Sequence, residues 1–167
     1  MKITVLAVGK IKESFYREAL SEYKKRLSRY CKLEIVEVAD EKTDENASPV
    51  QIDQVKEKEA QRLLSHIRDT DYCIALAIEG KKSDSVAFSK KIETLGVSGV
   101  SSIVFVIGGS LGLHKSVLSR ADYLLSFSDM TFPHQLMRVI LLEQIYRGYR
   151  IATSRIINDR FCSYAFV

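Results

Sequence analysis

Short apolar runs alternate with segments of helical spacing along most of the chain. Five runs have the length and the β-branched content of buried strands. They are ITVLAV (3–8), LEIVEV (33–38), CIALAI (73–78), IVFVI (103–107) and YLLSF (123–127). Because strands that alternate with helices form parallel sheets covered on both faces, the pattern predicts an α/β fold with a mostly parallel sheet and helices on both faces.

The segments between these runs carry apolar residues at helical spacing. Weaker helical patterns cover 50–67 and 84–95, and we expect a short helix after His114. The charged stretch 40–49, which contains the first proline, is expected to be an exposed loop. The clearest helix comes first, because its apolar positions recur every three or four residues along one face: Tyr16, Leu20, Tyr23, Leu27 and Tyr30.

The last predicted helix differs from the others, because apolar residues lie on nearly all of its sides. Pro133 suits a first helical turn, where a missing N–H costs nothing, and Thr131 is close enough to help cap the helix. A helix of this kind is buried on more than one side, and we expect one side to meet a second copy of the chain. Its apolar positions are Leu136, Met137, Val139, Ile140, Leu141, Leu142, Ile145, Tyr146 and Tyr149.

Length and composition fit one domain over residues 1–167. The chain is 46% hydrophobic, which suffices for a sizeable core. No apolar stretch approaches the roughly 20 residues that span a bilayer, and MKITVLAVGK is too short and too alternating for a signal peptide, so we expect a cytoplasmic protein without membrane contact. The cysteines Cys31, Cys73 and Cys162 are odd in number and far apart, which fits neither a disulfide framework nor a zinc site. We therefore expect no metal.

Positive charge is concentrated in two places, although the formal net charge is only +4. From Pro133 onward five arginines face two acidic residues. A second basic group ends the first helix: Lys24, Lys25, Arg26, Arg29 and Lys32. Local basic patches on a balanced chain suggest a polyanionic partner, whereas a solvated helix face would explain the charge alone.

The stretch FVIGGSLGLHK (105–115) places Gly108, Gly109 and Gly112 directly after the fourth strand. Ligands of open parallel sheets bind beyond the carboxyl ends of the strands, and glycines let the backbone approach a ligand closely. The first strand is followed by a single glycine rather than G-x-G-x-x-G, and no G-x-x-x-x-G-K-[ST] phosphate loop occurs. The glycine cluster therefore indicates either a ligand loop or a tight turn.

The stretch LSFSDMTFPHQLMRVILLEQIYRGYRI (125–151) follows the fifth strand, so its loop opens at the same sheet edge as the glycines. Two such loops can enclose one small molecule. Together with VGKIKESF, EYKKRLSRY, IALAIEGK and FVIGGSLGL, this stretch resembles the SPOUT-class methyltransferases. The resemblance is specifically to those that methylate N3 of a pseudouridine in bacterial large-subunit ribosomal RNA, and it covers roughly residues 1–150.

The resemblance implies a fold, a cofactor and a partner. Such proteins bind S-adenosylmethionine in a deep trefoil knot, here about residues 100–150, and act as homodimers on 23S ribosomal RNA within the large subunit or the whole ribosome. Asp129 departs from the residues typical of its position, so we assign its side chain no role. Carried over by position, the cofactor site comprises Leu76, Gly108, Gly109, Phe127, Ser128, Asp129, Met130, Thr131 and Phe132.

Methyl transfer to N3 demands chiefly alignment of the reactants and removal of a proton. The N3–H lies between two carbonyls and is acidic for an amide, and a nearby cation would stabilise the anion that it leaves. His134 and Arg138, four residues apart at the head of the last helix, are the catalytic candidates. Alternatively, His134 caps the helix and Arg138 pairs with an acid. The expected RNA contacts are Arg138, Arg147, Lys24, Lys25 and Arg29.

The chain departs from the family after Arg150. The family closes with a short Pro-Tyr-His tail, whereas this chain continues as IATSRIINDRFCSYAFV (151–167), in which Tyr164 is the only candidate tyrosine. We expect normal cofactor binding and reduced turnover on ribosomes. Two other functions stay open: a non-catalytic dimer that binds RNA or ribosomes, and a small-molecule methyltransferase on a similar sheet.

Overall fold

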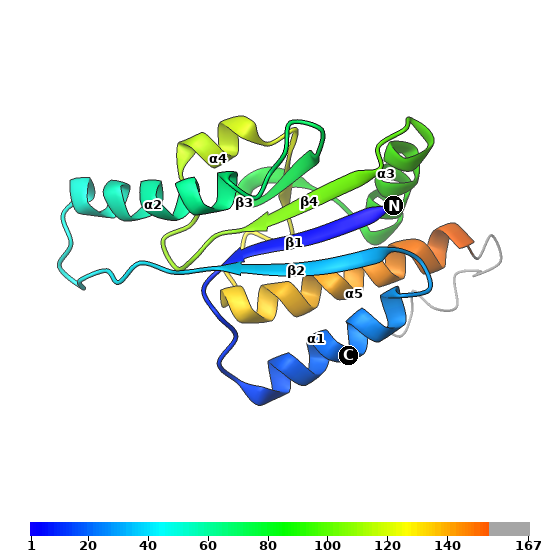
Figure 1. Cartoon of the computed structure of the whole chain (residues 1–167), viewed down its shortest axis with the longest axis horizontal. Helices are drawn as coiled ribbons and strands as arrows, with labels where there is room; N and C mark the ends of the chain where they lie inside the picture. Colours follow the sequence, from blue (N-terminus) through cyan, green and yellow to red (C-terminus); the bar gives the residue numbers. More distant parts are fainter. Residues whose placement is uncertain (154–167) are drawn as a thin grey trace.

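The computed structural model describes residues 1–153 of the chain (Figure 1). Each predicted strand is present, and β3 extends one residue before and four residues after its apolar run of six, because its far end pairs again with β5. The elements are β1 (Lys2–Val8), α1 (Ser14–Leu27), β2 (Lys32–Val38), α2 (Pro49–Leu64), β3 (Tyr72–Lys82), α3 (Ser85–Val97), β4 (Ser102–Ile107), α4 (Lys115–Arg120), β5 (Tyr123–Ser126) and α5 (His134–Thr153).

The five strands form one sheet in the order β2-β1-β4-β3-β5, and every pair of neighbours is parallel. The predicted parallel α/β sheet is confirmed. All five strands therefore end at one edge of the sheet, called the carboxyl edge below, and begin at the opposite edge, called the amino edge. The carboxyl ends of β4, β3 and β5 lie side by side, which brings the loops after them together.

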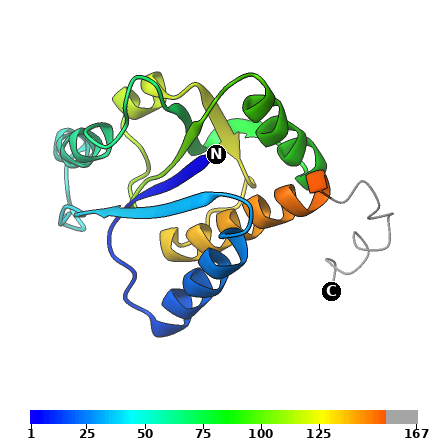
Figure 2. The same cartoon turned by 45° about the vertical axis from the view of Figure 1, so that its right-hand side comes forward.

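Helices cover both faces of the sheet, as the alternating pattern predicts (Figures 1 and 2). Because successive side chains of a strand point to opposite faces, Val5 and Phe105 join the core with α1, α3 and α5. Leu6 and Val104 join a second core with α2 and α4. The two faces thus bury separate clusters against the same strands.

Local signals set the starts of α2 and α3. Ser48 and Gln51 form a reciprocal capping box at the start of α2, and Pro49 occupies its first turn. The Asp84 side chain accepts from the Ala87 N–H at 2.7 Å and caps α3. The predicted loop 40–49 therefore ends at Ser48, where the helix is nucleated.

Helix α5 lies against the sheet between α1 and α3. Leu141, Leu142 and Ile145 have no exposed surface within the single chain. The apolar residues around this helix are thus largely explained by the chain's own core, and the side left for a second copy is narrower than the sequence suggests. The Pro133 carbonyl accepts the first helical bond, from the Met137 N–H at 2.9 Å, so Pro133 lies just before the helix rather than in its first turn.

The tail 151–167 begins inside α5, which is helical through Thr153. Residues 154–167, with Tyr164 and Cys162, lie outside the described residues. Cys31 and Cys73 are buried and free, and burial raises the pKa of the Cys73 thiol to about 11. Within residues 1–153 no helix is long and apolar enough to cross a membrane.

Candidate functional site

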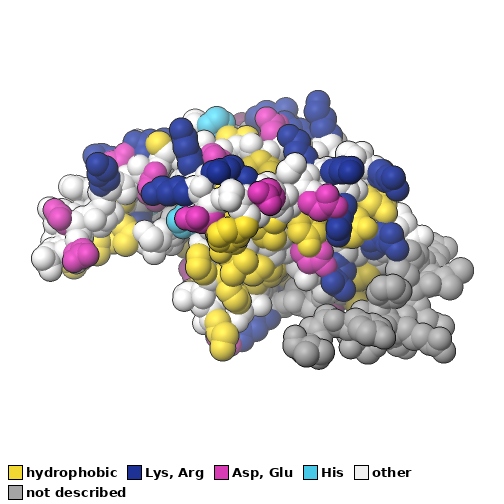
Figure 3. Space-filling model, turned by 90° about the horizontal axis from the view of Figure 1, so that it is seen from below, with side chains coloured by type: hydrophobic (Ala, Val, Ile, Leu, Met, Phe, Trp, Pro, Cys, Tyr) yellow, Lys and Arg dark blue, Asp and Glu magenta, His cyan; other side chains and the backbone are white. Residues whose placement is uncertain are grey.

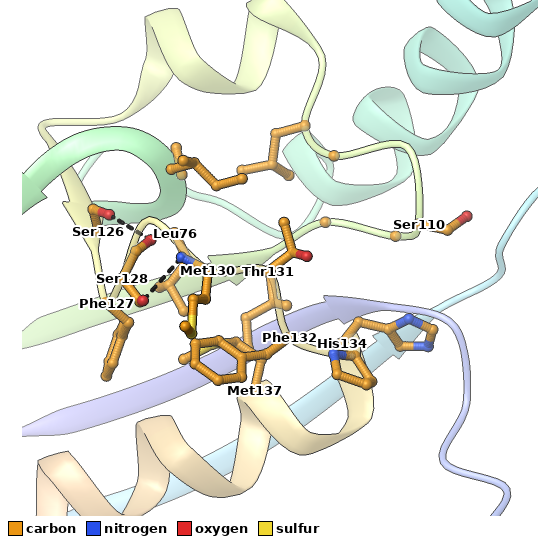
Figure 4. Close-up of a pocket in the computed structure, with 18 of the residues that line it drawn as sticks. Leu76, Ser110, Ser126, Phe127, Ser128, Met130, Thr131, Phe132, His134 and Met137 are labelled. Carbon is orange, nitrogen blue, oxygen red and sulfur yellow. Dashed lines mark hydrogen bonds between the residues drawn. The ribbon is translucent and has the colours of Figure 1, made fainter.

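A cavity of about 430 Å³ opens at the carboxyl edge, where β4, β3 and β5 end (Figure 4). This size falls in the range of small-molecule sites. Leu76 of β3, Ile107 of β4 and Leu125 of β5 contribute apolar walls, and Met137 of α5 closes one side. Ser126, Ser128 and Thr131 supply a few hydroxyls among these apolar surfaces, which is the composition typical of a cofactor pocket.

The glycine loop (108–112) forms one rim of the cavity, and each of its glycines has a structural reason. A Cβ on Gly108 would lie 2.9 Å from the carbonyl carbon of Gly112, and one on Gly109 would lie 3.2 Å from Cγ1 of Val8. Gly112 has φ +79°, a conformation that favours glycine. The two sequence explanations are therefore not exclusive: the loop is a tight turn that folds back on itself, and it also lines the cavity.

The loop 127–132 forms the opposite rim, and its side chains differ in direction (Figure 4). Ser128 Oγ accepts from the Met130 N–H at 2.9 Å and shapes the turn. Met130 is largely exposed, and Phe132 partly so, although both line the cavity. Asp129 does not line it; its carboxylate pairs with Lys82 at the end of β3. The remaining positions carried over from the family all line the cavity: Leu76, Gly108, Gly109, Phe127, Ser128, Met130, Thr131 and Phe132.

His134, the first residue of α5, also lines the cavity. Its imidazole lies over the backbone of Gly9, because a Cβ built there would be 3.4 Å from His134 Nε2. Gly9 has φ +80°, so this turn after β1 favours glycine. Burial and, secondly, the positive charge of Arg138 lower the pKa of His134 below its usual value. The neutral imidazole is therefore favoured and can accept a proton.

Arg138 lies one turn further along α5 and does not line the cavity. Its side chain has no exposed surface and pairs with Glu37 at 2.6 Å. It also donates to the carbonyls of Val8 and Gly9 at 2.8 and 2.7 Å. Of the two roles considered for this residue, pairing with an acid is what the geometry shows, and in this conformation RNA cannot reach the guanidinium.

The remaining predicted RNA-contact residues lie at the amino edge, away from the cavity. Lys24 and Lys25 are in the last turn of α1, and Arg29 follows it. Arg147 pairs with Glu143 one turn earlier on α5, near the end whose Tyr149 hydroxyl contacts Met1. Because α5 rises about 1.5 Å per residue, Arg147 is about 20 Å along the helix from His134. These side chains therefore do not border the cavity of their own chain.

Several residues that line the cavity were not predicted as site residues from the sequence. Ala77 and Ile78 end the apolar run of β3, and Met137 belongs to a helix that is apolar on most sides. Their role depends on strand order, which places β3 between β4 and β5. The other unpredicted lining residues are Ile107, Ser110, Leu111, Leu113, Leu125, Ser126 and Pro133. Residues 1–153 contain no cluster of His, Cys, Asp or Glu side chains that could hold a metal ion.

Known proteins resemble this chain over nearly its whole length. Ribosomal RNA large subunit methyltransferase H of Bifidobacterium adolescentis is 63% identical over 151 residues, which cover 90% of this chain and 95% of that protein. The proteins of the same name from Clostridium kluyveri and Clostridium beijerinckii are 57% and 58% identical, with the same coverage.

A solved structure and a family model also match this chain. A solved structure from Haemophilus influenzae Rd KW20, described as a probable methylase family protein, has a TM-score of 0.56 and 12% identity and covers 93% of this chain and 70% of that chain, which shows a shared fold. The family model described as Predicted SPOUT methyltransferase matches residues 1–155. With its parallel sheet, its carboxyl-edge cavity and this match, the chain belongs to the SPOUT methyltransferase family.

Proposed function

We propose that this chain is an S-adenosylmethionine-dependent methyltransferase that methylates N3 of a pseudouridine in 23S ribosomal RNA of the large subunit. The observation that carries the proposal is the cavity at the carboxyl edge, which is lined by eight of the nine residues that the family resemblance assigns to the cofactor. The names of relatives at 57–63% identity support a large-subunit ribosomal RNA as the substrate. A ribosomal substrate places the enzyme in the cytoplasm.

The residues present fit S-adenosylmethionine. Leu76, Leu125 and Met137 offer apolar surface for a flat base, while the backbone of the glycine loop and the loop 127–132 lie close enough to the cavity to donate and accept hydrogen bonds. The bound cofactor supplies a methyl group that is already activated on a sulfonium. The protein's task is therefore to bind, to orient and to accept a proton.

Alignment supplies much of the rate in this proposal. Holding two reactants in line reaches effective concentrations on the order of 10⁵ M or more. His134, neutral and at the rim of the cavity, accepts the proton that leaves N3. The apolar walls limit water, which strengthens the electrostatic interactions within the site.

The trefoil knot is part of this proposal. Residues 74–76 of β3 pair with 123–125 of β5, and after a break Lys81 and Lys82 pair with Leu125 and Ser126. At that break the chain passes so close to β5 that a Cβ on Gly80 would lie 2.7 Å from the carbonyl carbon of Leu124. This crossing leaves no room for a side chain at Gly80, and the knot itself is carried over from the family resemblance.

We also include a homodimer in the proposal. Leu136 and Ile140 are half-buried and are not part of the chain's own core clusters, so they mark the free side of α5. Figure 3 shows hydrophobic side chains gathered on the face that α1 and α5 cover, bordered by charged residues of both signs. Ile140→Glu should shift a dimer toward the monomer in light scattering. Leu141→Glu would disrupt the monomer's own core instead, because Leu141 is fully buried.

The decisive experiment is transfer of labelled methyl from S-adenosylmethionine to ribosomes from a strain that lacks the modification, followed by nucleoside analysis. We expect 3-methylpseudouridine. Ribosome binding without cofactor binding would favour the non-catalytic RNA-binding dimer, and transfer to small molecules alone would favour the small-molecule methyltransferase. RNA contact by Lys24, Lys25, Arg29 and Arg147 stays part of the proposal, and ribosome binding by variants of these residues tests it.

A further inference from the structure

Arg138 is the largest fully buried side chain of the described residues, although it carries a charge. Buried charges are costly unless they are paired and hydrogen-bonded. Three acceptors surround its terminal nitrogens, namely Glu37 and the carbonyls of Val8 and Gly9. Its Nε finds no acceptor within residues 1–153. A side chain buried at this cost, one turn from the cavity, calls for a role beyond filling space.

The contacts of Arg138 link the head of α5 to the turn that follows β1. Its guanidinium holds the carbonyl of Gly9 at 2.7 Å, and Gly9 is the residue over which the His134 ring lies. Lys12 ties the same segment to α5 by a second contact, from its N–H to Gln135 Oε1 at 2.9 Å. The turn after β1, on which the imidazole lies, is thus held to α5 through both Arg138 and Gln135.

Charged groups from α5 and from two loops face His134. Arg138 lies on the same helix, Asp40 follows β2, and Lys12 lies between β1 and α1. Burial lowers the pKa of His134 most, Arg138 is the next cause, Asp40 opposes both, and Lys12 adds to the lowering. Glu37 of β2 pairs with Arg138 and so weakens the field that reaches the imidazole.

We propose that Arg138 is a positioning residue that acts through His134: by holding the Gly9 carbonyl it fixes the backbone turn on which the imidazole lies, so that the ring is placed to accept the N3 proton. The positive charge of Arg138 acts in the same direction, because it lowers the pKa of His134. The inference rests on the proposed function. During turnover the N3–H proton moves to the imidazole, which becomes imidazolium and returns the proton to water. Arg138 itself touches neither substrate nor cofactor.

NMR titration of the three histidines tests this assignment without any turnover. In Arg138→Met the pKa of His134 should rise, because a buried cation that lowers it is removed. The signals of His66 and His114 serve as internal controls. Arg147→Met is the matched variant, on the same helix but about 20 Å away, and it should leave the His134 titration unchanged.

A second variant gives the opposite sign and preserves the hydrogen bonds. Glu37→Gln keeps an acceptor for the guanidinium but removes the compensating charge, so the pKa of His134 should fall. If Arg138→Met does not fold, this variant still decides: an unchanged or raised His134 pKa overturns the proposal. An unchanged His134 pKa in folded Arg138→Met overturns it as well.

The pH profile of methyl transfer links the titration to catalysis. Its acidic limb should move to higher pH in Arg138→Met and to lower pH in Glu37→Gln, following His134. Arg138→Lys, which keeps the charge, should restore the wild-type limb even if the rate is lower. Limbs that do not follow the NMR values would overturn the positioning role. If the wild type transfers no methyl group to ribosomes, the proposed function fails, while the titration still judges the link between Arg138 and His134.

Discussion

The two edges of the sheet are built from the same strands and are closed in opposite ways. At the amino edge, polar side chains satisfy the strand ends: Asp122 accepts from the Cys73 N–H at 2.7 Å, and Asp71 pairs with Arg68 at 2.8 Å. Arg120 donates to the Asp71 carbonyl at 3.1 Å and joins these groups. These hydrogen bonds and ion pairs form a connected network at the amino edge, and we assign no ligand site there.

At the carboxyl edge, glycines and apolar side chains stand where the amino edge has charged ones. The loops after β4 and β5 leave a hollow of about 430 Å³, and Ile78, Met130 and Phe132 on its border are exposed. The backbone of the glycine loop and of the loop 127–132 lines this hollow and lies within reach of a ligand. The comparison teaches that a cavity arises where the loops carry glycines and apolar side chains, whereas charged side chains that bond to the strand ends close the opposite edge.

The largest expected effect is on stability, and it concerns the room for a side chain at one glycine near each edge of the sheet. Gly80→Ala should lower the free energy of unfolding by about 3 kcal/mol, because its Cβ would lie within 2.7–2.8 Å of the backbone of Leu124 and Leu125. Gly99→Ala, near the start of β4, meets no atom within 4 Å and has only the strain of φ +92°, which costs about 1 kcal/mol. Urea denaturation of both variants measures the difference. Equal losses would mean that the crossing at Gly80 is not tight.

The second effect concerns two carboxylates with opposite pKa shifts. Arg68 holds the pKa of Asp71, at the amino edge, well below its usual range, whereas burial raises that of Glu59, beside the glycine loop. Asp71 therefore stabilises the fold above its unfolded pKa, and this contribution is lost as the pH falls through the folded pKa. The contribution of Glu59 is present below its unfolded pKa and is lost as the pH rises through the folded one.

Substitution should reveal these opposite signs. Asp71→Asn should cost about 2 kcal/mol at pH 7 through the loss of charge-assisted bonds, and the deficit should shrink below about pH 4. Glu59 Oε1 accepts from the Glu41 N–H at 3.0 Å, and Glu59→Gln keeps an acceptor for this bond. Its free energy of unfolding should exceed that of the wild type by up to about 1 kcal/mol as the pH rises above the pKa of Glu59 in the unfolded chain. Thermal unfolding from pH 3 to 8 measures both, and parallel curves would contradict the contrast.

Sequence reasoning succeeded where a residue's role depends on its neighbours in the chain. The apolar runs predicted all five strands, because strands of a parallel sheet that is covered on both faces consist mostly of apolar residues. The helix predicted over 50–67 begins one residue earlier, at Pro49, next to the loop predicted over 40–49. The positions of the two loops followed from the rule that parallel strands end together.

It failed where the role depends on residues far apart in sequence. The sequence left two roles open for Arg138, catalysis or pairing with an acid, because its partner Glu37 is 101 residues away. The apolar residues around α5 suggest a dimer helix, but α1 and α3 cover much of that surface within one chain. The basic group at the end of α1 was not placed by any pattern, and strand direction puts it at the amino edge.

The third effect tests the cavity directly. Thr131→Trp should fill it and weaken S-adenosylmethionine binding at least about tenfold, or about 1.4 kcal/mol, since Thr131 lines the cavity and is exposed enough to be replaced without loss of the fold. Asp129→Trp is the matched control, two residues earlier in the same loop but outside the lining. Calorimetry should show nearly wild-type affinity for the control. Equal losses in both variants would indicate a general effect of the loop.

The smallest effect separates the two edges as surfaces for RNA. Lys10 and Lys12 are exposed beside the turn under His134, at the carboxyl edge, whereas Lys24 and Lys25 are exposed at the amino edge. Each phosphate contact that is lost should reduce the slope of log affinity against log salt by about 1. Replacing either pair by alanine should therefore lower the slope for ribosomal RNA. Only the pair at the carboxyl edge should also slow methyl transfer at saturating RNA, because it lies next to the reacting base; slower transfer in the Lys24 and Lys25 variant instead would mean that the amino edge, of this chain or of a second copy, faces the site.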